Sequence, residues 1–162
     1  MKESKSVRIL AGRGTEFQTG RDGTYDEFLT PAELSRRRWQ ILLPNADDAP
    51  RGQDWIAHRA GELNNVRPPY DRDRLAQQIV SATRDLSSNV APGTFEVALY
   101  DAPHIGRVIL TDDGLFIAFY NGMRGGKKGP TFHFGKGEFY EAYGRYFDLI
   151  WQDSRPLVAA ES

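Results

Sequence analysis

The chain has 162 residues, a formal net charge of −1 and no cysteine. This length predicts one domain spanning residues 1–162, with an ordered core over about residues 7–155. The missing cysteines exclude disulfides and thiolate catalysis, and the near-neutral charge excludes the global basic field of a general DNA-binding protein. No apolar run reaches the roughly 18 residues of a membrane span, and the first residues lack a signal-peptide pattern. We therefore expect a cytoplasmic protein with no membrane partner.

The first half of the chain alternates apolar runs with helices that begin at capping residues. Apolar runs predict strands at residues 7–11 and 39–43. Thr30, Asp54 and Asp71 each carry a side-chain oxygen that can cap a helix, and Thr30 is followed by proline and then by glutamate at the capping-box position. The helices predicted from these caps cover about residues 31–37, 54–63 and 72–86.

The second half of the chain reads as strands followed by one long helix. Strands are predicted at residues 95–99, 108–110 and 115–119, with a hairpin turn at Asp113-Gly114. A final helix is expected over about residues 138–153. Its predicted core face contains Phe139, Tyr143, Phe147, Ile150 and Trp151, whereas Tyr140 is expected to lie off that face. This order predicts an α/β fold, a mixed β-sheet with helices packed on its faces.

Residues 122–129 form the strongest local candidate for an anion site. Glycines such as Gly125 and Gly126 let backbone N–H groups approach an oxyanion, and Arg124, Lys127 and Lys128 add positive charge. The spacing is not that of a Walker loop. The alternative is a solvated loop.

Histidine and aspartate side chains supply the candidate catalytic groups. His104 stands before a strand and could act as a nucleophile or phosphate ligand. His133 alternates with two phenylalanines and could line a cleft beside His104; the alternative is a half-exposed histidine on a short edge strand. Asp112 could supply an acid, although such residues commonly serve a hairpin turn. His58 is expected at the surface, and three histidines without an acidic cluster indicate neither a metal site nor a cofactor.

Arg13 follows the first strand in a glycine-rich loop. In α/β sheets, loops beyond the carboxyl ends of strands line the ligand crevice. Arg13 and Glu16 are therefore candidates for the same cleft as Arg107, the alternative being an ordinary surface turn. The basic run 36–38 could contact a nucleic-acid backbone or stay solvated.

The element order and the strings RWQILLPN, GRVILTDDGLFIAFYN and YGRYFDLIW resemble small phospholipase D-like domains, above all the degenerate ones of bacterial regulators. The resemblance spans about residues 7–151. In active members the signature is H-x-K-x-x-x-x-D, in which histidine is the nucleophile and lysine grips the phosphate. Here Arg107 and Asp112 match the lysine and aspartate, but the histidine position falls on Ile105, one residue after His104. A one-residue shift turns a strand side chain to the opposite face, which a bulge at Gly106 could correct.

The resemblance implies a degenerate phospholipase D-like domain that binds a phosphate-bearing or other anionic ligand, such as a nucleotide, in a sensor or regulatory role. Arg107, Arg13 and the 122–129 loop would hold the ligand. One alternative is a homodimeric phosphodiesterase, nuclease or phosphotransferase that uses His104 or His133, because two copies of the motif meet in active members. The other alternative is a protein-interaction module with exposed aromatic side chains.

Overall fold

The computed structural model describes residues 4–17, 30–46, 54–65, 68–103, 105–120 and 130–159. The strands are β1 (Ser6–Leu10), β2 (Arg38–Pro44), β3 (Phe95–Tyr100), β4 (Gly106–Thr111), β5 (Leu115–Phe119), β6 (Thr131–Phe134) and β7 (Arg155–Pro156). The helices are α1 (Pro31–Arg36), α2 (Trp55–Asn64), α3 (Arg72–Ser87) and α4 (Glu138–Asp153), with a 3-10 turn η1 (Thr15–Phe17).

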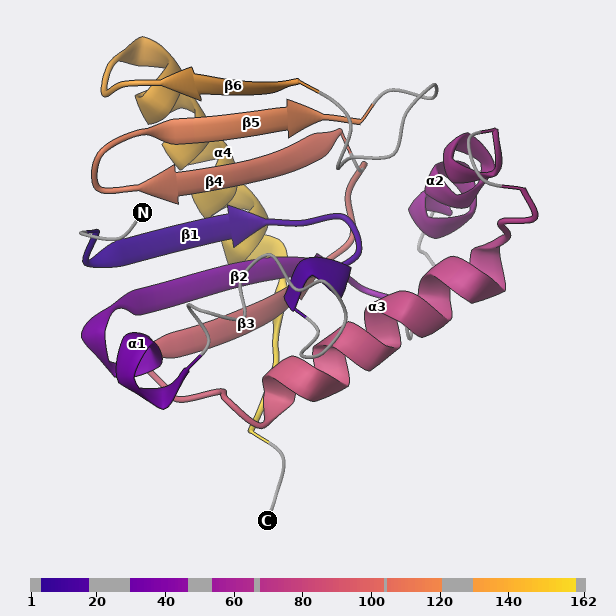
Figure 1. Cartoon of the computed structure of the whole chain (residues 1–162), viewed down its shortest axis with the longest axis horizontal. Coiled ribbons are helices and arrows are strands. Elements are labelled where there is room, and N and C mark those ends of the chain that lie inside the picture. The colour runs from indigo at the N-terminus through magenta and orange to yellow at the C-terminus, as the bar shows by residue number, and fades with distance from the viewer. Residues whose placement is uncertain are drawn as a thin grey trace.

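The seven described strands form one mixed sheet in the order β6-β5-β4-β1-β2-β3-β7 (Figure 1). Strands β1, β2 and β3 run parallel, and every other pairing is antiparallel. The predicted mixed α/β sheet is therefore confirmed, and residues 131–134 form an edge strand, which was the alternative interpretation of His133. The two-residue strand β7, which forms the opposite edge, was not predicted.

Each face of the sheet packs against different helices. Val7, Ile9 and Ile41 point toward the face that carries α1, η1 and α3. The alternate residues Leu10 and Leu42 point toward α4 on the other face. This alternation follows the two-residue period of a strand, and it assigns every strand side chain to one face.

Helix α4 covers its face of the sheet with a different aromatic set from the one predicted. Tyr140 packs against the core cluster, and its hydroxyl donates to the Thr111 carbonyl at 2.9 Å. Phe139 is 61 % exposed and stacks on Phe134 instead. Residues 140, 143, 144 and 147 are spaced three or four positions apart and lie on one side of the helix. Residue 139 lies about 100° around the helix from residue 140. The prediction for these two neighbouring residues was therefore wrong.

Strands β1, β2 and β3 end at the same edge of the sheet, which we call the carboxyl edge. Helix α2 stands beyond this edge and packs on α3 through Ile56, Ala60 and Leu63 (Figure 1). None of the described helices is both long and apolar enough to cross a membrane. The carboxyl edge therefore brings together the loops after the parallel strands and a helix that faces them.

Candidate functional site

Arg107 lies near the start of β4, where that strand meets the carboxyl edge. It is paired with Ala118 of β5, and its side chain is on the same face as Ile109, two residues further along. The side chain is half-buried, and it forms no hydrogen bond or ion pair with any described residue. A guanidinium that has lost part of its hydration without gaining a carboxylate is stabilised by any anion that reaches it.

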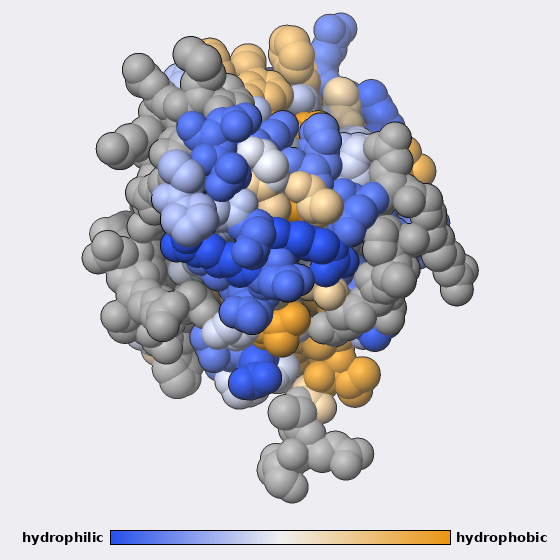
Figure 2. Space-filling view, turned by 90° about the vertical axis from the view of Figure 1, so that its right-hand side faces the viewer, coloured by the Kyte–Doolittle hydropathy of each residue, from blue (hydrophilic) through white to orange (hydrophobic). Residues whose placement is uncertain are grey.

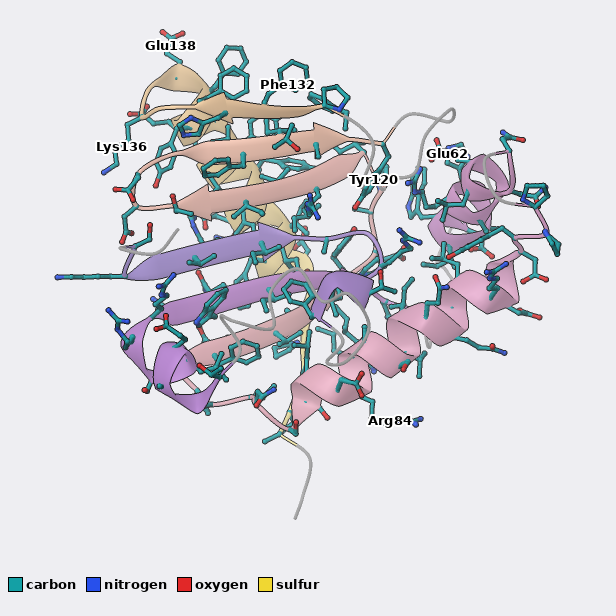
Figure 3. The ribbon with its side chains drawn as sticks, viewed as in Figure 1. Glu62, Arg84, Tyr120, Phe132, Lys136 and Glu138 are labelled. Carbon is teal, nitrogen blue, oxygen red and sulfur yellow. The ribbon has the colours of Figure 1, made fainter. Side chains whose placement is uncertain are left out.

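Tyr120 forms the centre of a second group at the same edge. Its hydroxyl accepts a hydrogen bond from the Gly12 N–H at 3.0 Å, and the Arg59 guanidinium stacks 4.0 Å from the centre of its ring. The side chain of Arg59 is only 3 % exposed and lies 2.6 Å from a Glu62 oxygen. Figure 3 shows Tyr120 at the end of β5 and Glu62 on α2 across from it. These contacts join α2 to the sheet.

Glycine is required at position 12 for this packing. A Cβ there would lie 2.7 Å from the Tyr120 hydroxyl and 2.8 Å from its ring. Any larger residue would displace the tyrosine, on whose ring Arg59 rests. The glycine-rich loop after β1 is thus explained in part by a close approach to an aromatic ring.

Arg13 follows Gly12 and is also half-buried, with no hydrogen bond or ion pair to any other residue in the described ranges. We call Arg13, Arg59, Arg107 and Tyr120 the arginine site. Of these three guanidinium groups, that of Arg59 is paired with Glu62, whereas those of Arg13 and Arg107 have no carboxylate partner among the described residues. The described surface on this side of the molecule is mostly hydrophilic, with apolar side chains gathered near its top and bottom (Figure 2). The arginine site is therefore suited to an anionic group.

Ile105 occupies the position that the resemblance assigns to the catalytic histidine. It lies two residues before Arg107, is 42 % exposed, and its carbonyl accepts the Tyr120 N–H at 3.2 Å. The pairing of Gly106 with Phe119 and of Arg107 with Ala118 is regular, so the bulge considered at Gly106 is absent. The position beside the arginine therefore holds an apolar side chain that cannot act as a nucleophile. His104 itself lies outside the described residues.

Asp112 lies at the opposite end of β4, about 17 Å from Arg107 along the strand. Its carboxylate accepts the backbone N–H groups of Lys5 and Ser6 at 2.5 and 3.2 Å. The neighbouring Asp113 accepts a hydrogen bond from Ser4 at 3.0 Å. This arrangement matches the hairpin-turn interpretation, and it joins the turn to the first residues of β1.

His133 is on the same sheet face as Arg107 but is not in contact with it. The two positions are two strands and two residues apart, a Cα separation of roughly 12 Å. The His133 ring is exposed and stacks on Phe116 with the centroids 4.5 Å apart. His58 is exposed near Glu62, as predicted for a surface residue. Arg107, Asp112 and His133 are therefore not brought together.

The predicted glycine-rich loop residues Arg124, Gly125, Gly126, Lys127 and Lys128 lie outside the described residues. The described chain stops at Tyr120, a member of the arginine site, and resumes at Pro130. The sequence thus connects this basic segment directly to the site.

Among the described residues, a hollow beside α3 and the acidic and histidine side chains are the other candidates for binding a ligand or metal. A hollow of about 390 Å³ follows the outer side of α3, and its lining consists of Asp73, Ala76, Gln77, Val80, Ser81 and Arg84. It contains no residue singled out from the sequence. Among the described residues, no group of three or more histidine or acidic side chains could hold a metal ion.

Comparisons with known proteins yielded no relative. No protein-family model matches the chain, and neither a curated protein nor a solved structure is significantly similar to it. The phospholipase D-like resemblance stays a prediction from the sequence. Functional inference therefore depends on the geometry of the arginine site.

Proposed function

We propose that this chain is a degenerate phospholipase D-like domain that binds a phosphate-bearing or other anionic ligand at its carboxyl edge and acts as a sensor or regulatory module. The observation that supports this most directly is Arg107, a half-buried guanidinium that no described residue neutralises. Half-buried charges usually have a partner within the protein, because partial desolvation is costly. A ligand anion would supply that partner.

The neighbouring residues favour an oxyanion as the ligand. The planar guanidinium of arginine binds carboxylate and phosphate oxygens in pairs, which fits phosphate better than a simple halide. Arg59 is held rigidly between Glu62 and the Tyr120 ring. Arg59 thereby orients the Tyr120 ring beside the site but does not reach a ligand itself, because its side chain is only 3 % exposed.

Three observations favour binding over hydrolysis. Ile105 stands where a nucleophilic histidine would be needed. The Asp112 carboxylate is occupied by two backbone N–H groups at the other end of the strand. The His133 ring stacks on Phe116 and has no contact with Arg107.

Calorimetric titration with inorganic phosphate and pyrophosphate tests the proposal. The Arg107→Ala variant is expected to bind at least ten-fold more weakly, since a charge-assisted hydrogen bond contributes about 1.5–3 kcal/mol. Arg145→Ala is the matched control, because Arg145 is an exposed arginine of α4 without a described partner. Equal loss in both variants would mean nonspecific charge attraction, and no binding by the parent protein would contradict the proposal.

A hydrolysis assay separates binding from catalysis. The protein is expected to hydrolyse an activated phosphodiester such as bis(4-nitrophenyl) phosphate no faster than the uncatalysed background rate. Turnover that disappears in a His104→Ala or His133→Ala variant would instead support the phosphodiesterase alternative. A circular-dichroism melt of each variant verifies that the fold is retained.

A further inference from the structure

The face of the sheet that carries Arg107 is not covered by a described helix over β4, β5 and β6 (Figure 1). Helices α1 and α3 lie over β2 and β3, and α4 lies on the other face. We call this uncovered surface the open face. Strand alternation and the pairing register place on it the buried Ile109 and Ala118 and, reaching solvent around them, Arg107, Phe116, Tyr120, Thr131 and His133.

The open face contains an aromatic pair near its outer edge. The Phe116 and His133 rings are paired across β5 and β6, with centroids 4.5 Å apart and planes 22° apart. Phe116 is half-buried, whereas His133 is exposed on the edge strand. A Cβ at Gly114 would lie 2.9 Å from His133 Nε2, so the imidazole lies close over the turn backbone. The two rings therefore pack against each other, and one of them, that of His133, is exposed to solvent.

The aromatic pair and Arg107 are close enough to contact one small ligand. Phe116 is a diagonal neighbour of Arg107 across β4 and β5, a separation of about 7–8 Å between Cα atoms. The long arginine side chain shortens the gap between its guanidinium and the rings. One end of the open face therefore attracts an oxyanion, and the other offers aromatic surface for a planar ring.

We infer that the anionic ligand is a nucleotide, whose phosphate contacts Arg107 and whose base contacts the Phe116–His133 pair. This inference rests on the proposed function of the arginine site. Aromatic side chains bind bases by stacking, which depends little on base identity, and arginine binds the phosphate. The same chemistry occurs in a free mononucleotide and in single-stranded nucleic acid, so either source would fill the site.

Ligand comparison tests the contribution of the base. AMP is expected to bind roughly 5- to 100-fold more tightly than ribose 5-phosphate, because base–aromatic stacking strengthens binding by about that factor. His133→Ala should bring AMP down toward the affinity of ribose 5-phosphate while leaving ribose 5-phosphate unchanged. His133→Phe should retain the preference for AMP. A (dT)10 oligonucleotide that binds more tightly than TMP would identify nucleic acid as the source, and equal binding would identify the mononucleotide.

Different results would overturn the nucleotide inference and the anion-binding proposal. Equal affinity for AMP and ribose 5-phosphate, with both lost in Arg107→Ala, would overturn the nucleotide inference and leave anion binding in place. The same conclusion follows if His133→Ala weakens both ligands equally. No binding of AMP, ribose 5-phosphate or inorganic phosphate by the parent protein would overturn both proposals. Arg145→Ala serves again as the charge control.

Discussion

Polar side chains at the two ends of β4 differ in whether they have partners within the protein. At the turn end, the Thr111 hydroxyl accepts the N–H groups of Asp113 and Gly114, both at 3.2 Å, and Asp112 accepts two further amides from the start of β1. At the carboxyl-edge end, the half-buried Arg107 has no described partner. The polar groups at the turn end have partners within the protein, whereas Arg107 has none among the described residues.

The difference shows how a motif can mislead when it is read by spacing alone. Arg107 and Asp112 stand in register with the lysine and aspartate of a catalytic signature, which suggests a shared task. In the structure Asp112 holds the chain at β1, and Arg107 faces the carboxyl edge. A matched polar side chain indicates a role in stability, whereas an unmatched, half-buried charge indicates a role in binding. Three measurements would break or sharpen this comparison.

The largest expected effect is on stability at the turn end. Asp112→Ala should lower the free energy of unfolding by about 2 kcal/mol, because the Lys5 and Ser6 amides lose a charged acceptor. Urea denaturation measures the change, with Asp101→Ala as an exposed control expected to stay within about 0.5 kcal/mol. Phosphate affinity should be unchanged in both variants. A stable Asp112→Ala protein with lost phosphate binding would place Asp112 in the functional site instead.

A smaller effect on stability is expected at the end of β4 that lies near the carboxyl edge. Tyr120→Phe keeps the ring under Arg59 but removes the hydroxyl that accepts the Gly12 N–H. The expected cost is about 1 kcal/mol of unfolding free energy, together with a several-fold weaker affinity for phosphate as the loop that carries Arg13 loses its anchor. Tyr143→Phe on α4 is the control. If the two variants behave alike in both assays, Tyr120 does not position the site.

The smallest effect concerns pH and the start of α2, the helix that carries Arg59. Burial raises the pKa of Asp54, but hydrogen bonds from the Ala57 amide and from Arg72, with the charge of Arg72, outweigh it and leave the pKa below 3.8. A lowered pKa stabilises the fold above about pH 4, and this contribution is lost as the pH falls through the folded-state pKa.

Asp54→Asn isolates this charge, because asparagine caps a helix about as well as aspartate. The stability difference from the parent should be about 0.5 kcal/mol at pH 7, since the ion pair is one-third exposed, and should decrease as the pH falls through the lowered pKa of Asp54. Asp71→Asn, at a cap of α3 without a described ion pair, is the control for replacing a capping aspartate by asparagine. Parallel urea titrations at pH 7 and pH 3 decide whether the two caps differ.

Local features of the fold could be predicted because the interactions that set them span few residues. Thr30, Asp54 and Asp71 each accept the amide three residues ahead, so helix starts could be read directly from the sequence. The long helix ends at Asp153, as its apolar period indicated. By contrast, β7 contains only Arg155–Pro156, which is too short to show any alternation.

The arginine site could be predicted only in part, because its contacts join distant segments. Arg13 was found from its position after a strand, and Arg107 from its match to the lysine of the family signature. Arg59 was missed, since an arginine in a polar helix is ordinarily solvated, and its burial depends on Tyr120, 61 residues further along the chain. Nothing in the sequence indicated that Tyr120, which follows β5, would contact Gly12, which follows β1.

The two outermost strands of the sheet, β7 and β6, differ in a way that affects self-association. At one edge β7 contributes Pro156, which has no N–H to donate to a further strand. At the other edge β6 contains no proline within Thr131–Phe134, and the side chain of Phe132 is exposed. Unpaired donors and acceptors on an edge strand are a template for another chain. Aggregation at high concentration is therefore expected to begin at β6, and a lysine in place of Phe132 should raise the solubility limit.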